Sequence, residues 1–197
     1  MTVALHDSLR AGIGWQLPSK GRMAMACLIA AEAAIFIIFI VAYLFYAGKS
    51  ISRPGPDILS PPVALSICLL SSSLTIHFAV GALKGAKVTL FSALWFLTIA
   101  LGVIFLAGTG LEWRHLIHDE GLTIRTNLFG TTYYSLVGLH AFHVSAGLLL
   151  MAFVLAFALL GWVKPLHTER LEIISLYWHF VDVVWVVVFT VVYIIGR

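Results

Sequence analysis

Charged residues are scarce in this chain. Asp, Glu, Lys and Arg make up 11% of its 197 residues, against about 25% in ordinary soluble domains. Hydrophobic residues reach 61%, where globular proteins hold roughly 45–50%. So few charges could not cover a soluble domain, and the basic residues lie in turns between apolar runs rather than on the clustered face that nucleic-acid binding requires. Composition therefore predicts an integral membrane protein and argues against nucleic acid as a partner.

Cysteines and catalytic motifs are scarce too. The two cysteines, Cys27 and Cys68, both lie inside apolar runs, which argues against a disulfide framework or a cysteine-based zinc site. The sequence also has no glycine-rich phosphate loop, no thiol pair and no nucleophile with a base nearby. We therefore expect no catalytic residue and no metal site in this chain.

Long apolar runs are what the sequence does contain. Each is long enough for a helix to cross a hydrocarbon core of roughly 30 Å, and five such uniformly apolar runs do not suit a β-barrel. Pro, Gly and charged residues separate them, most densely between residues 51 and 62. The sequence predicts an all-α bundle of five transmembrane helices, forming a single membrane domain over residues 1–197. The predicted spans are residues 23–47, 63–83, 88–111, 131–162 and 171–195.

The turns carry the signal for orientation. With five spans, seven of the 12 Lys and Arg residues fall on the side of the N-terminus and five on the other side. Cytoplasmic loops carry an excess of Lys and Arg. We therefore expect the N-terminus in the cytoplasm and the C-terminus outside.

Ionisable residues inside the predicted spans are the candidate functional residues, because each costs roughly 2.5–3.5 kcal/mol at a helix centre. Glu32 lies among alanines in the first span, which favours close helix contact with an inward carboxyl group. It is either a proton-relay or lipid-headgroup site, or a protonated packing residue. His77 follows a Ser/Thr cluster on the second span, and we interpret that cluster as interhelical packing.

The fourth and fifth spans carry the remaining buried polar candidates. His140 and His143 are three residues apart on one face, and structural histidines are favoured over haem or metal ligands. His179 and Asp182 are also three apart, so we expect each to satisfy the other on one helix face. Trp178 and Trp185, two turns apart, share nearly the same face.

Motifs in five places resemble one family, in that family's order. Residues 177–185, Tyr-Trp-His-Phe-Val-Asp-Val-Val-Trp, are similar to the closing signature of subunit III of haem–copper oxidases. Residues 139–147 resemble its Phe-His-Gly-Leu-His-Val-x-x-Gly pattern, and Glu32 before Ile35 and Phe36 resembles its membrane-embedded Glu. Residues 101–113, which include Glu112, and His77 match two further elements. Together the matches cover about residues 22–196.

The resemblance implies an accessory, non-catalytic subunit of a proton-pumping respiratory oxidase that reduces oxygen to water. Haem and copper would belong to the partner subunits I and II, and none to this chain. The chain would pack on subunit I, bind phospholipids and support proton uptake and sustained activity, in a bacterial inner membrane. Membership of a larger respiratory supercomplex stays open. The buried polar residues that would support lipid binding or proton uptake are Glu32, His77, His140, His143, His179 and Asp182. Trp178, Trp185 and Glu112 would form the helix-packing signature.

Departures from the family pattern leave alternatives. Ala31 stands where a Ser often precedes the Glu, Leu139 replaces a Phe, and Thr109 replaces a Gln. A subunit III-like accessory protein of a nitric oxide reductase is one alternative. The others are a small haem-binding membrane protein that uses the histidines, and a small transporter or proton channel centred on Glu32.

Overall fold

The protein is a bundle of five long helices in a computed structural model, which describes residues 19–46, 49 and 54–196. The helices are α2 (Lys20–Tyr46), α3 (Val63–Lys84), α4 (Val88–His118), α5 (Leu128–Leu159) and α6 (Thr168–Phe189), and α6 continues as the π-helical turn η3 (Thr190–Ile195). Short 3-10 turns precede α3 (η1, Pro56–Ile58) and α6 (η2, Pro165–His167). Five helices are long and apolar enough to cross a membrane, which confirms the predicted all-α architecture.

The largest difference in boundaries is at the end of α4. The sequence predicts that this span ends at residue 111, but the helix continues through His118. Leu116 explains the extension, because it is buried and gives the last two turns an apolar face against the bundle. Charged residues beside it, such as Arg114, stay exposed on the opposite side.

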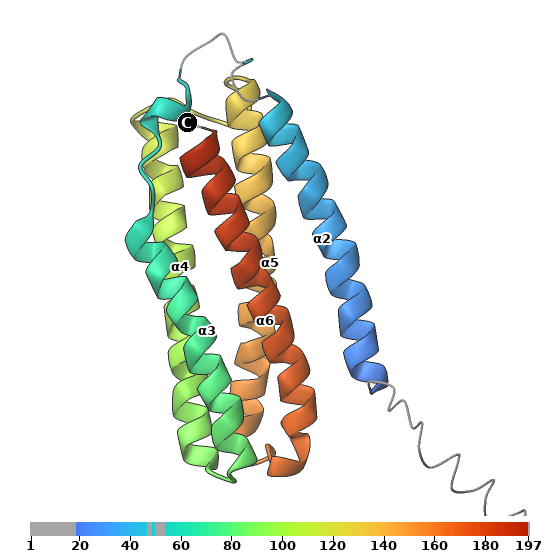
Figure 1. Cartoon of the computed structure of the whole chain (residues 1–197). Coiled ribbons are helices and arrows are strands. Elements are labelled where there is room, and N and C mark those ends of the chain that lie inside the picture. Colours follow the sequence, from blue (N-terminus) through green and yellow to red (C-terminus); the bar gives the residue numbers. More distant parts are fainter. Residues whose placement is uncertain (1–18, 47–48, 50–53, 197) are drawn as a thin grey trace, which may run out of the picture.

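Four of the helices form a closed ring, and α2 lies outside it. Contacts join α3 to α4, α4 to α5, α5 to α6, and α6 back to α3. Helix α2 packs on α5 and α6 (Figure 1), and its end near Lys20 leans away from the ring. The polar residues therefore occupy two kinds of interface, one inside the ring and one between the ring and α2.

Trp178 of α6 marks the closest approach inside the ring. A Cβ atom on Gly102 of α4 would lie 3.0 Å from its indole, and one on Gly147 of α5 would lie 2.9 Å from it. Its ring nitrogen donates a hydrogen bond to the Ser72 hydroxyl of α3, at 2.8 Å. Small residues let membrane helices approach closely. Here two glycines make room for one large ring that contacts the other three helices of the ring, α3, α4 and α5.

Candidate functional site

Glu32 and His143 form the contact between α2 and the ring. The carboxylate oxygen Oε2 of Glu32 lies 3.0 Å from Nε2 of His143, in a pair whose side chains are 25% and 7% exposed. Phe36, one turn further along α2, is buried, and its ring centre lies 4.9 Å from that of His143. The polar pair is therefore covered on one side by an aromatic ring from the same helix as the carboxyl group.

The hydrogen bonds of His143 determine how many protons this pair holds. Its Nδ1 lies 2.8 Å from the carbonyl oxygen of Leu139, which can only accept, so Nδ1 carries a proton. The contact between Nε2 and Glu32 then has two forms. Either a protonated imidazole donates to a carboxylate, or a protonated carboxyl group donates to a neutral imidazole. In both forms the pair is neutral overall and shares one proton.

His140 lies one turn away, in contact with several aromatic rings. Its ring stacks on Trp185 at 5.0 Å between centres and meets Phe105 edge to face at 5.9 Å. The side chain is 1% exposed, and neither ring nitrogen has a hydrogen-bond partner among the described residues. The geometry makes His140 part of the aromatic packing around Trp185.

Asp182 and His179 meet inside the ring through a third residue. We expected the two side chains to satisfy each other directly, but both bind the Ser73 hydroxyl of α3. That hydroxyl lies 3.0 Å from Nδ1 of His179 and donates to Oδ2 of Asp182. Nε2 of His179 lies 3.2 Å from the Ser175 hydroxyl. The four residues form one continuous chain of hydrogen bonds from Ser175 to Asp182.

Burial differs along this chain. Asp182 is 2% exposed, and its second oxygen, Oδ1, is buried with no hydrogen-bond partner in the described part of the protein. His179, which is partly exposed, and Ser175, which is 7% exposed, line a pocket of about 410 Å³ between α3 and α6. His77 lines the same pocket, as do Lys84 and Glu172 near its end. The chain thus joins an open pocket to a buried carboxyl group.

Three other hydroxyl groups of α3, those of Ser66, Ser72 and Thr75, bind tryptophans or a threonine of neighbouring helices. Ser66 accepts a hydrogen bond from the Trp185 ring nitrogen at 3.0 Å. The hydroxyl of Thr75 lies 2.8 Å from that of Thr98 on α4. Interhelical packing is therefore what the structure shows for most of the Ser/Thr cluster, and Ser73 is the member that contacts ionisable groups.

Glu112 lies at the opposite end of the ring from Lys84. The Tyr193 hydroxyl donates to its Oε1 at 3.1 Å, and the Tyr133 hydroxyl lies 3.4 Å from that of Tyr193. The contacts join α4, η3 and α5. Glu112 is thus part of a polar contact between three helix ends.

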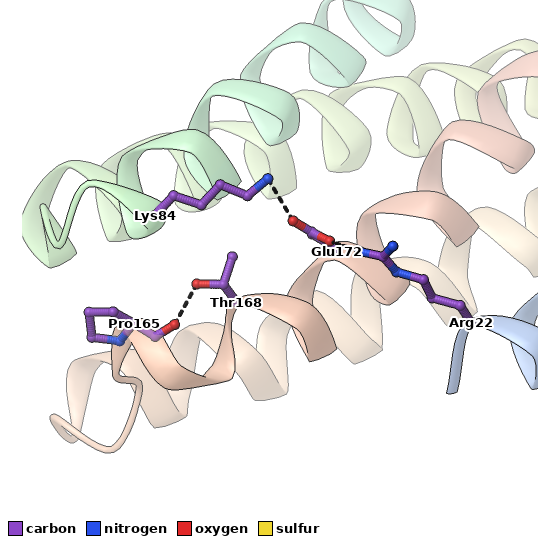
Figure 2. A network of polar contacts seen from close by, with 5 residues as sticks. All are labelled: Arg22, Lys84, Pro165, Thr168 and Glu172. Atoms are coloured by element: carbon purple, nitrogen blue, oxygen red, sulfur yellow. Dashed lines mark hydrogen bonds and ion pairs between the residues drawn. The ribbon is translucent and has the colours of Figure 1, made fainter. Parts of the chain in front are cut away.

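A further polar cluster was not predicted from the sequence. Glu172, at the start of α6, forms ion pairs with Arg22 of α2 and with Lys84 of α3, the latter at 2.7 Å. Figure 2 shows the two cations converging on this carboxylate from opposite sides. Sequence reasoning missed Glu172 because a charge near the end of a span is usual at a membrane surface. The available signal was the presence of acidic residues, Glu169 and Glu172, at a helix start on the same side as basic helix ends.

Among the described residues, no group of three or more His, Cys, Asp and Glu side chains is arranged to hold a metal ion. The nitrogens of His143 are both engaged, one by a carbonyl group and one by Glu32. The ring of His140 is enclosed by other rings. These contacts favour the structural interpretation of the two histidines over the haem-ligand alternative.

Comparison with known proteins gives a consistent result. Residues 19–197 match the family model described as cytochrome c oxidase subunit III. The chain is 38% identical to cytochrome c oxidase subunit 3 of a Synechocystis strain, over 90% of this chain and 77% of that protein. It is 35% identical to the protein of the same name from Corynebacterium diphtheriae, and 33% identical to that from Bacillus subtilis. These matches cover 83% of this chain, and 80% and 79% of the two relatives.

Proposed function

Because this chain belongs to the cytochrome c oxidase subunit III family, we propose that it packs on subunit I of a proton-pumping haem–copper oxidase as a non-catalytic subunit. In this role it binds phospholipids and supports proton uptake and sustained turnover. The observation that carries the proposal is the family match over residues 19–197, nearly the whole chain. Haem and copper would lie in the partner subunits, with subunit II beside subunit I.

The proposal includes a location and an orientation. The chain is a multi-pass membrane protein with five spans, which we place in the bacterial inner membrane. The excess of Lys and Arg on the side of the N-terminus puts that terminus in the cytoplasm. On this orientation the cluster of Arg22, Lys84 and Glu172 faces the cytoplasm, which is the side from which an oxidase takes up protons.

The structure offers two places through which such support could act. The pair of Glu32 and His143 holds one shared proton at the edge of the ring. The hydrogen-bonded chain from Ser175 to Asp182 begins in the pocket that Lys84 lines, at one end of the bundle. Both are polar anchors between helices, in which His143 and Asp182 are buried and Glu32 is 25% exposed.

The first experiment is a pull-down in mild detergent through a tag on this chain. A reduced-minus-oxidised spectrum of the eluate is recorded before and after the partners are stripped. We expect haem signals together with a large partner, and no haem signal from the isolated chain. A haem spectrum that stays with the isolated chain would overturn the proposal.

A second test concerns Glu32. In Glu32→Gln the side-chain amide can still donate to Nε2 of a neutral His143, so the contact between α2 and α5 is kept. We expect the complex to assemble normally and sustained oxidase turnover to change modestly. Complete loss of assembly in this variant would show that the role assigned to Glu32 is wrong.

A further inference from the structure

The chain from Ser175 to Asp182 has a directional property that follows from its hydrogen bonds. When Asp182 is ionised, Ser73 donates to it and must therefore accept from Nδ1–H of His179. Nε2 of the neutral imidazole is then an acceptor, and Ser175 donates to it. All three hydrogen bonds point toward Asp182.

The same atoms support the opposite arrangement after one proton has moved. The Ser73 proton passes to Asp182, the Nδ1 proton passes to Ser73, and the Ser175 proton passes to Nε2. Ser175 then takes a new proton from a hydronium ion in the pocket, which leaves a water molecule behind, so one proton enters and Asp182 becomes neutral. His179 ends as the other neutral tautomer, and all three hydrogen bonds now point toward the pocket.

The two ends of this chain lie in different surroundings. Ser175 and His179 line the pocket shared with His77, Lys84 and Glu172, and Lys84 is the last residue of α3. Asp182 lies about 15 Å further along α6 than Glu172, at a rise of about 1.5 Å per residue. That is roughly half of a hydrocarbon core of about 30 Å.

Among the residues that the structure describes, the hydrogen bonds beyond Asp182 no longer form a relay. Trp185 donates to Ser66, and Ser66 donates to the backbone carbonyl of Pro62 at 2.9 Å. A carbonyl oxygen has no proton to pass on. The stacked rings of Trp185 and His140 fill the same level of the bundle. The path from the pocket therefore ends at the carboxyl group.

We propose that Asp182 is a proton-holding site in the middle of the membrane, loaded from one side only through Ser175, His179 and Ser73. The ligand is a proton delivered by water in the pocket between α3 and α6. These residues would carry the support of proton uptake proposed above, and in that respect the inference rests on the proposed function. It acts as a store that exchanges with one aqueous side, not as a transmembrane channel.

The test is infrared spectroscopy of the intact complex in lipid vesicles during exchange from H₂O to D₂O. The carbonyl stretch of a protonated carboxyl group is assigned to Asp182 by its loss in Asp182→Asn, and its shift in D₂O gives the exchange rate. We expect Ser73→Ala to slow that rate by at least about tenfold, the factor for a barrier raised by about 1.4 kcal/mol. Ser73→Thr keeps the hydroxyl and should keep the native rate.

Ser71→Ala is the matched control on the same helix. The Ser71 hydroxyl donates to the carbonyl of Ile67 in its own helix, at 2.7 Å, so exchange at Asp182 should be unchanged. His179→Phe gives a second break in the relay if Ser73→Ala fails to fold. The proposed site would be overturned if either relay variant exchanged at the native rate. It would also be overturned if the native complex showed no signal from protonated Asp182 between pH 5 and 9.

A separate measurement tests the link to the proposed function. If exchange follows the relay and Asp182→Asn lowers sustained oxidase turnover, both the site and its role in proton uptake are supported. If exchange follows the relay and turnover is native, the site stands and its role in proton uptake is refuted. The exchange measurement needs no turnover, so the two failures are distinct.

Discussion

The first and last helices of the bundle are both apolar enough to cross a membrane, but their surroundings are very different. In the most apolar 18-residue stretch of α2, 6% of the residues are buried. In the corresponding stretch of the last span, 50% are buried. Helix α6 is enclosed by α2, α3 and α5, and α2 contacts the ring along one side only. Apolar composition places both helices in a membrane, but it does not determine which of them the rest of the chain encloses.

The two helices are also held by different interactions. Aromatic rings and close backbone approach hold α6, most clearly at Trp178 between Gly102 and Gly147. Helix α2 relies on two buried aromatic residues, Phe36 and Tyr43, and on polar contacts from Glu32 and Arg22. Hydrophobic burial drives little association inside lipid, so packing and hydrogen bonds carry most of the difference. We therefore expect the two helices to respond very differently to substitution.

The largest effect is expected at the centre of α6. Trp178→Ala removes a fully buried ring, and the two glycines beside it have no side chains to fill the space. The expected loss is about 3–5 kcal/mol in free energy of unfolding, measured by reversible unfolding in mixed micelles. Trp162→Ala is the matched control, because that ring is 64% exposed and stacks only on Phe157. Equal losses in both variants would contradict the central role of Trp178.

An intermediate effect is expected where α2 meets the ring. Glu32→Leu removes the partner of His143 and leaves Nε2 without a hydrogen bond. Hydrogen bonds between membrane helices average about 0.6 kcal/mol, with a maximum of about 1.7 kcal/mol, so we expect α2 to loosen while the ring stays folded. Distances between spin labels on α2 and α5 measure the change. Unfolding of the whole bundle would show that α2 is as central as α6.

The smallest effect is expected at the ion pairs of Glu172. Arg22 and Lys84 are 51% and 60% exposed, and exposed pairs contribute about 0.2–1 kcal/mol and weaken with salt. Arg22→Ala should therefore release the end of α2 slightly, in the same spin-label measurement. Lys84→Ala should leave α2 in place, because it breaks only the contact with α3. High salt should remove the difference between Arg22→Ala and the unsubstituted protein.

The sequence predicts the five helices because each apolar run is long enough to span lipid without a partner. It also identifies Glu32, His143 and Asp182 as unusual, because an ionisable group inside a span requires an explanation. Their partners could not be predicted in the same way. Glu32 and His143 lie 111 residues apart, and helical periodicity gives the face of a side chain but not the neighbour opposite it.

Ser73 shows most clearly which contacts could not be predicted from the sequence. Serine on a membrane helix commonly bonds back to its own backbone, as Ser71 does, so nothing local distinguishes the two residues. Ser73 differs because α6 brings His179 and Asp182 to its hydroxyl group. The spacing of three residues correctly places His179 and Asp182 near each other, but which residue joins them is a property of the fold.

The fit of Trp178 between two glycines has a consequence for how this protein can change. A side chain larger than hydrogen at Gly147 is compatible only with a smaller residue at position 178, and a smaller residue there loses the hydrogen bond to Ser72. The effects of such substitutions should therefore be strongly non-additive. Residues 72, 102, 147 and 178 come from four different helices but are expected to change together. A single substitution at any of them should lower stability until a second substitution at another of these positions compensates.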